Sequence, residues 1–288
     1  NAIYSGSGIS GLGNEAVTIS DTTSAANVSG ILSKTSGVVT ATVTSDTAAS
    51  LNSALTNTTG NDALTLTVTG TAAATDLTAL DGKTSVNVGA TAVTTITGTQ
   101  AQVVAINVGT ITTSGNYAVT LSDTSLSAAA IKTVNTQNGT GAIDISSVTT
   151  ITSSTAADVL EIVNNTNSTF TTAANYAVTL SGISSASDVN TIVNDTTGIV
   201  TATVTEATAA SLNSALANAS STDALTLTLT DTALASADDL IALDGKTSVT
   251  VNAGSVTSVT DTYADINTLY GLSGISGLGN EAVTISDE

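Results

Sequence analysis

The sequence predicts an α/β repeat solenoid, in which parallel strands alternate with short helices in a leucine-rich-repeat-like coil. Three observations predict it. Segments recur along the 288 residues, period-two patterns alternate with helical spacings at near-constant length, and one copy of the repeat lacks whole units. Parallel strands joined by crossovers suit such a pattern. An all-β parallel solenoid is the alternative, but the Ala- and Leu-rich stretches favour helices.

The longest repeat has an offset of 266 residues, because the segment ISGLGNEAVTISD at 9–21 recurs unchanged at 275–287. Within this period, a strand reading AVTIS or AVTLS opens each of three related modules and then begins a fourth copy; these strands start at Ala16, Ala118, Ala177 and Ala282. The second module keeps the first and last units and lacks the two middle ones. An array in which each unit contacts only its neighbours tolerates such a loss.

These repeats predict the organisation of the chain, which reads as an excerpt of a longer array. The predicted parts are the end of a preceding repeat or loop at 1–15, a four-unit module at 16–117, a shortened two-unit module at 118–176, a four-unit module at 177–281, and the start of the next 266-residue repeat at 282–288.

Each elementary unit of about 21 to 25 residues has a strand half and a helix half. In the strand half, Val39, Ala41 and Val43 alternate with threonines, which predicts one apolar and one threonine-covered face. In the helix half, Ala48, Leu51 and Leu55 follow the i, i+3, i+7 spacing of a helix with one buried side. A further short strand is expected at 93–97, before a helix at 99–107.

Asp or Ser/Thr stands where each predicted strand leads into a helix, and there it is expected to cap the first helical turn. The aspartates in this position are Asp21, Asp46, Asp123, Asp231 and Asp261. Gly82 and Gly245 follow predicted helices and are expected to adopt the left-handed conformation that ends many helices.

The same five aspartates are the candidate calcium ligands, since calcium prefers several oxygen ligands. No EF-hand loop and no glycine-rich calcium-binding nonapeptide accompanies them, so capping is the favoured interpretation. The densest acidic pair, Asp238 and Asp239, is expected in the first turn of a helix. No other cofactor is expected.

The composition excludes several function classes. The chain contains no Cys, His, Met, Pro or Trp, and its only basic residues are four lysines. An imidazole base, a thiolate and a Cys/His zinc site are therefore absent, and no convincing pair of titratable groups remains, so we expect that the chain is not an enzyme. The net charge of −19 argues against nucleic acid or an anionic membrane as partner. No apolar run is long enough to insert into a membrane.

Two glycine-containing motifs resemble nucleotide-binding loops. Gly82-Lys83-Thr84 and Gly245-Lys246-Thr247 look like the end of a phosphate-binding loop, but the required earlier glycine is missing and the lysine follows a helix instead of preceding one. The glycines at 6, 8, 11 and 13, and at 271, 274, 277 and 279, precede a strand, whereas a dinucleotide motif follows one. Turns are the favoured interpretation of both.

Two binding functions remain as alternatives. Threonines that alternate along stacked strands resemble an ice-binding array, although threonine is also a common residue on a solvated strand face. A glycan or surface ligand would need a segment unlike the others, and the one asymmetry is 161–175 in the second module, with the single phenylalanine, Phe170.

The AVTLSD strand, the TAASLNSAL helix and the VTTITGT strand resemble the repeats of giant bacterial surface proteins, found in cyanobacteria and proteobacteria. That resemblance implies an exported protein at the extracellular bacterial cell surface, assembled as an adhesin, a surface layer or an extracellular filament. We therefore expect a structural segment of a surface layer, sheath or filament whose principal partner is itself, through end-to-end or lateral assembly. An adhesin stalk is the alternative.

Overall fold

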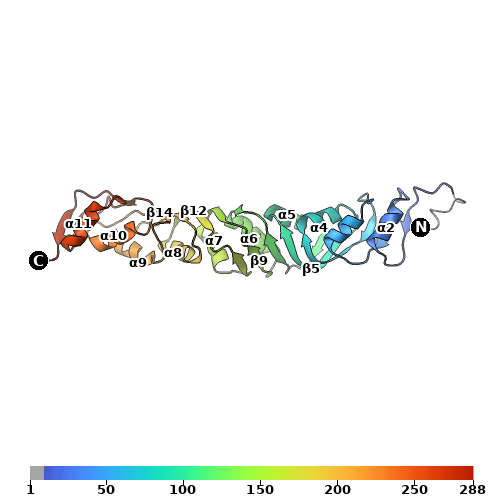
Figure 1. The fold of residues 1–288 in the computed structure, drawn as a ribbon, viewed down its shortest axis with the longest axis horizontal. Helices are drawn as coiled ribbons and strands as arrows, with labels where there is room; N and C mark the ends of the chain where they lie inside the picture. The colour runs from blue at the N-terminus through green and yellow to red at the C-terminus, as the bar shows by residue number, and fades with distance from the viewer. Residues whose placement is uncertain (1–9, 288) are drawn as a thin grey trace. The chain divides into compact units, whose positions relative to one another are not determined.

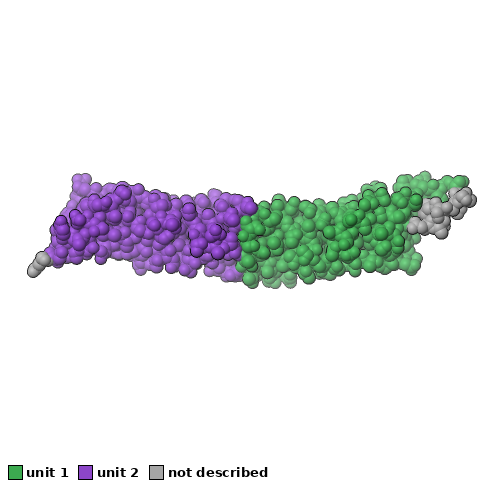
Figure 2. All heavy atoms as spheres, viewed as in Figure 1, with its two compact units in different colours: residues 1–123, 133–147, 167–171 green, residues 124–132, 148–166, 172–288 purple. Residues whose placement is uncertain are grey.

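The computed structural model describes residues 10–287, which form two compact units (Figure 2). Most of the expected loop at 1–15, glycines 6 and 8, and residue 288 of the last expected segment lie outside the described residues. The first unit contains residues 10–123, 133–147 and 167–171; the second contains 124–132, 148–166 and 172–287.

The first unit contains two sheets built from parallel pairs of strands (Figure 1). One has the order β1 (Val17–Thr18), β2 (Val39–Thr42), β3 (Ala63–Thr65). The other has the order β11 (Phe170–Thr172), β9 (Ile143–Ile145), β7 (Ala118–Leu121), β5 (Val88–Gly98), β4 (Thr67–Ala73), with β6 (Ile111–Thr113) also paired to β5.

The second unit contains three sheets, also of parallel pairs. The largest has the order β14 (Ala224–Thr226), β13 (Val200–Val204), β12 (Ala177–Ser184), β10 (Thr150–Ser154), β8 (Ser125–Leu126). The others are β15 (Leu234–Ser236), β17 (Ser258–Asp261), β19 (Ala282–Ile285), and the pair β16 (Val251–Asn252) and β18 (Ile275–Ser276).

Short helices separate most of the strands, which confirms the α/β class and contradicts the all-β alternative. The first unit contains α2 (Ala25–Leu32), α3 (Ala48–Ala54), α4 (Ala74–Asp81), α5 (Gln100–Ala105) and the 3-10 turn η1 (Ile106–Val108). Both units contribute residues to α6 (Ala128–Gln137). The second contains α7 (Ala156–Val163), α8 (Ala186–Asp195), α9 (Ala209–Ala215), α10 (Ala237–Asp244) and α11 (Tyr263–Gly271).

The two halves of the expected unit fold as their periodicity predicts. Val39, Ala41 and Val43 are buried while the threonines between them are exposed. On α3, Ala48 and Leu51 are buried, and α3 contacts both β4 and the next helix, α4. The apolar interior is therefore made of small aliphatic side chains, and burying a leucine of this kind stabilises by about 1.5–3 kcal/mol.

Ser or Thr occupies the N-cap of most helices, and its side chain accepts a hydrogen bond from the third backbone amide of the helix. The N-caps with this bond are Ser24, Thr47, Thr99, Thr155, Ser185, Thr208, Ser236 and Thr262. The expectation that Ser or Thr caps these helices is therefore confirmed, and the expectation that an aspartate caps the helix it precedes is wrong. The hydroxyl that makes this bond lies one to five residues after the aspartate, closer to the first turn of the helix.

Two further expectations need correction. Gly82 and Gly245 keep right-handed helical angles, with φ of −69° and −75°, because the amide of the following lysine still bonds back into the helix. The strand expected at 93–97 is part of the continuous 11-residue strand β5, and the helix expected at 99–107 is divided into α5 and η1.

Candidate functional site

The five candidate calcium ligands lie in five separate strand–helix units of the chain; each such unit of about 21 to 25 residues is called a coil below. Asp21 is exposed in a bend, and Asp46 accepts the amide of Thr47 at 2.7 Å. The other three carboxylates each accept the first or second amide of a helix that lies 22 to 23 residues earlier. These contacts are Gln100 N to Asp123 (2.7 Å), Ala209 N to Asp231 (2.8 Å) and Asp238 N to Asp261 (3.3 Å).

These contacts form a cap that reaches across from the next strand. The first amides of a helix have no partner within the helix, and a carboxylate there also interacts favourably with the helix dipole. Asp287 binds the first amide of α11 in the same way, at 2.7 Å from Tyr263 N. In α6 the acceptor is the Ser154 hydroxyl, 2.8 Å from Ala128 N. Asp123, Asp231 and Asp261 therefore cap helices, but those of the preceding unit.

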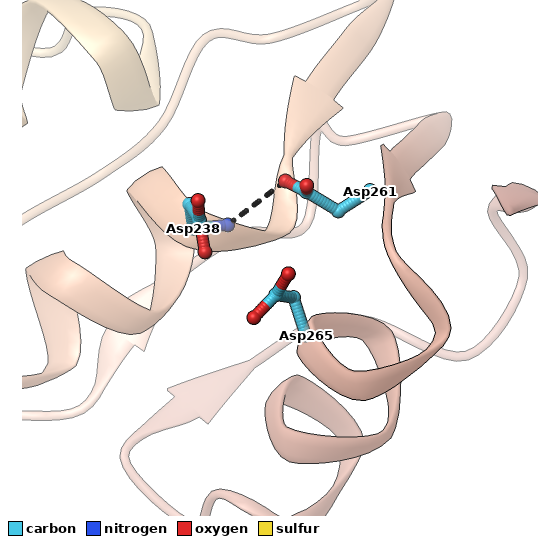
Figure 3. Close-up of side chains that lie close together, drawn as sticks. All are labelled: Asp238, Asp261 and Asp265. Atoms are coloured by element: carbon cyan, nitrogen blue, oxygen red, sulfur yellow. Dashed lines mark hydrogen bonds between the residues drawn. The ribbon is translucent and has the colours of Figure 1, made fainter. Parts of the chain in front are cut away.

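One cluster of three carboxylates, Asp238, Asp261 and Asp265, is found within residues 10–287 (Figure 3). Asp238 lies in the first turn of α10, as expected; Asp261 ends β17, and Asp265 lies in the first turn of α11. One oxygen of each lies within 4.8 Å of the others. Asp261 is the only member that the sequence singled out as a ligand; a separation of 23 residues, one coil, would have pointed to Asp238.

The surroundings shift the pKa of Asp238 and that of Asp261 in opposite directions. The like charges of Asp265 and Asp261 raise the pKa of Asp238 above its ordinary value. The hydroxyl of Ser236 donates to Asp261 at 2.9 Å and, with the amide of Asp238, lowers the pKa of the Asp261 carboxyl. Thr262 donates its hydroxyl to Asp265.

The chemical capacity of this cluster is limited. Three carboxylates could attract a hard cation, but calcium takes 6 to 8 oxygens and two of these carboxylates already accept hydrogen bonds. The three residues are exposed or only half-buried, so water would supply the remaining ligands. Asp261 and Asp265 instead accept hydrogen bonds from groups at the N-termini of α10 and α11.

The motif that resembles a phosphate-binding loop forms a junction between coils. Lys246 donates from Nζ to the carbonyl of Leu216 at 2.9 Å, and Lys83 donates in the same way to Leu55. Both carbonyls belong to the residue that ends a helix of the preceding coil, α9 or α3, where a positive charge interacts favourably with the dipole. Each lysine therefore binds a helix end, which supports its interpretation as a turn motif.

The threonine after each of these lysines is buried and bonded to the preceding strand. Thr247 accepts from Leu225 N at 2.9 Å and donates to Leu225 O at 2.8 Å. Thr84 makes the same two bonds to Leu64, at 3.0 and 2.8 Å. Because a buried hydroxyl needs partners, these contacts specify the register between coils.

Two buried aspartates were not predicted by the sequence. Asp62 and Asp223 are 1% and 3% exposed. One oxygen of each accepts the first amide of the strand in the preceding coil, Val39 N at 2.9 Å or Val200 N at 3.0 Å. The other oxygen closes the local turn by accepting an amide three residues earlier, at 3.0 Å in both. Their identical places, 161 residues apart, were the available signal.

Phe170 and the rows of threonines are the features that suggested ligand binding and ice binding. Phe170 is half-buried on β11, next to β9. The threonine rows are short: Thr40 faces Thr18 on one side and Ala63 on the other, and Thr201 faces Thr179 and Ala224.

A depression of about 420 Å³ in the second unit is lined by polar residues including Asn194, Asp195 and Asn218.

In comparisons with known proteins, no protein-family model, curated protein or solved structure matched this chain. Across residues 10–287, every helix is too short or too polar to cross a lipid bilayer.

Proposed function

We propose that this chain is an α/β solenoid segment of a secreted bacterial cell-surface protein, and that it assembles into a surface layer, sheath or extracellular filament. In this proposal the coils have a mechanical role and require neither a catalytic group nor a cofactor.

One observation supports the proposal above the others: the polar contacts described above join residues about one coil apart. The carboxylate caps span 22 to 24 residues and the lysine contacts 28 to 30, while the buried threonines reach back 20 or 22. Bonding confined to nearest neighbours is the pattern of a repeat array, whose stability is a sum of units and interfaces.

The composition supports an exposed, extended role. The net charge of −19 favours solubility, and the absence of proline leaves every backbone amide available for sheet bonding. Self-association is proposed because stacked strands leave an edge at each end of an array, which another chain or another repeat would cover.

The test is to locate the protein on the cells that produce it. Immunogold electron microscopy with an antibody to this segment should label ordered layers or filaments outside the cell, and protease added to intact cells should remove the signal. A cytoplasmic marker protein, left intact by the same protease, is the control. Label confined to the cytoplasm, or only isolated monomers in the native material, would contradict the proposal.

A further inference from the structure

An asparagine makes a contact in the second module that a threonine makes in the other two. In each module, the carbonyl of the residue before the AVTIS or AVTLS strand accepts a hydrogen bond from a side chain of the following coil. These bonds are Thr35 Oγ1 to Glu15 O (2.6 Å), Thr196 Oγ1 to Tyr176 O (2.6 Å) and Asn138 Nδ2 to Tyr117 O (3.3 Å). The second module therefore differs from the others in placing an amide side chain at this contact.

The side chain of Asn138 is completely enclosed. Asn138 is 0% exposed, and its Nδ2 also donates to Gly141 O at 2.7 Å. Both N–H groups of the side-chain amide are thus used. Among residues 10–287, no group donates a hydrogen bond to its Oδ1. The surroundings therefore fit an amide nitrogen and offer no protein donor to a negatively charged oxygen.

The residue after Asn138 has to be glycine. Gly139 has a φ of 66°, and a Cβ there would lie 2.1 Å from the carbonyl oxygen of Gly115 and 2.4 Å from Oδ1 of Asn116. The fold therefore requires an Asn-Gly pair at this place, and the sequence contains no other such pair. In an Asn-Gly pair no side chain hinders the glycine nitrogen from attacking Cγ of the asparagine.

We propose that Asn138 is a deamidation site that the closed coil protects, and that the product prevents the coil from closing again. The nitrogen of Gly139 attacks Cγ of Asn138, so that a C–N bond forms and the bond from Cγ to Nδ2 breaks. Nδ2 leaves as ammonia and takes the proton of the Gly139 amide with it. Water then opens the succinimide ring and leaves an aspartate or an isoaspartate at position 138.

The closed coil slows this reaction in two ways. The two hydrogen bonds of Nδ2 stabilise the amide group, and both are lost when the nitrogen leaves. Attack on Cγ also places negative charge on Oδ1, where the described part of the chain offers no donor to stabilise it. Once the coil opens, water donates to Oδ1 and the side chain rotates freely. Deamidation is therefore expected to follow local opening.

The product does not fit the closed coil. A carboxylate at position 138 only accepts hydrogen bonds, and it would face the carbonyl oxygens of Tyr117 and Gly141. A buried charge without a donor is strongly destabilising. The reaction therefore converts a reversible opening of this coil into a permanent one. This inference goes beyond the structural function proposed above and does not depend on it.

The first test compares deamidation in the folded and the unfolded full-length chain, both in mildly alkaline buffer and the latter in guanidinium. Mass spectrometry quantifies the peptide that contains residue 138, with Asn57 as the internal reference. We expect Asn138 to react faster than Asn57 in the unfolded chain. In the folded chain it should react at least about 10-fold more slowly, because it waits for local opening. Equal rates for Asn138 in the two samples, or an unfolded rate no faster than that of Asn57, would overturn the proposal.

The second test measures what the product does to the coil. Asn138→Asp carries the product, and Asn138→Thr is the matched control because threonine makes this contact in the other two modules. The amide of Val119 donates to Ala142 O at 2.8 Å, so its hydrogen exchange reports opening of the coil.

We expect exchange at Val119 to be on the order of 100-fold faster in Asn138→Asp than in Asn138→Thr. The deamidated fraction of aged wild-type protein should show the same fast exchange, which tests the inference even if Asn138→Asp does not fold. Equal exchange in the two variants, or slow exchange in the deamidated wild-type fraction, would refute the inference that deamidation keeps the coil open.

Discussion

Replacing the buried aspartate Asp62 with alanine should loosen the joint between two neighbouring coils. Asp62 is 1% exposed, and its carboxylate accepts the buried amide of Val39 at 2.9 Å and the amide of Thr59 at 3.0 Å. The side chain of alanine offers no acceptor, so the amide of Val39 would remain buried without a partner.

The size of the effect follows from which of these bonds is buried. A hydrogen bond to a charged group contributes about 1.5–3 kcal/mol, and a buried donor left unpaired adds its desolvation penalty. Thr59 is exposed, so water replaces Asp62 there. We therefore expect Asp62→Ala to lower the local unfolding free energy by about 3 kcal/mol. Asp223→Ala, which breaks the matching bond to Val200, should cost the same.

Amide hydrogen exchange is the direct assay, because a repeat array does not always unfold in one step. Exchange at Val39 should accelerate on the order of 100-fold, which is the factor that corresponds to about 3 kcal/mol. Exposed Asp21 provides the control, and Asp21→Ala should change stability by less than about 0.5 kcal/mol. If Val39 stays protected and guanidinium unfolding of Asp62→Ala shifts no more than the control, the joint does not depend on this carboxylate.

Three further predictions concern the second unit. Gly198→Ala places a Cβ 2.3 Å from the carbonyl oxygen of Tyr176 and should destabilise the protein by about 3 kcal/mol in chemical denaturation. Gly271→Ala is the control: it has open space around it and should leave stability unchanged or slightly raised. Equal effects of the two substitutions would contradict the close approach of Gly198 to Tyr176. Asp238→Asn should raise the thermal midpoint at pH 7, because neighbouring charges raise the pKa of this carboxyl and its ionisation therefore opposes folding. This gain in midpoint should vanish as the pH falls to about 3, where the carboxyl is protonated in both the folded and the unfolded state. The gain should also shrink in 1 M salt, which screens the neighbouring charges. Burial and the 2.6 Å bond to Asp195 raise the pKa of Tyr176. Stability should therefore fall as the pH rises above about 10, because the phenol then ionises in the unfolded state but not yet in the folded state. Tyr176→Phe should weaken this pH dependence of the thermal midpoint, measured from pH 9 to 11.

The α/β class and the faces of its elements follow from the sequence because they depend on local periodicity. Alternation of Val39, Ala41 and Val43 with threonine, and the spacing of Ala48 and Leu51, place each side chain on one face of its own element. The identity of 9–21 and 275–287 likewise shows, without coordinates, that one kind of coil occurs twice.

Only the tertiary structure decided which group satisfies which backbone amide. Asp123 and Asp231 stand before a helix in the sequence, yet each caps the helix that precedes it in the chain. Asp62 reads as an ordinary turn residue in the sequence, and only the structure shows that it accepts the amide of Val39. The reason is physical: periods of 2 and 3.6 residues are properties of a single segment, whereas a bond over some 20 to 30 residues depends on how neighbouring strand–helix units pack against each other. That packing is fixed by buried side chains, by glycine contacts such as that of Gly198 with Tyr176, and by hydroxyls buried between strands.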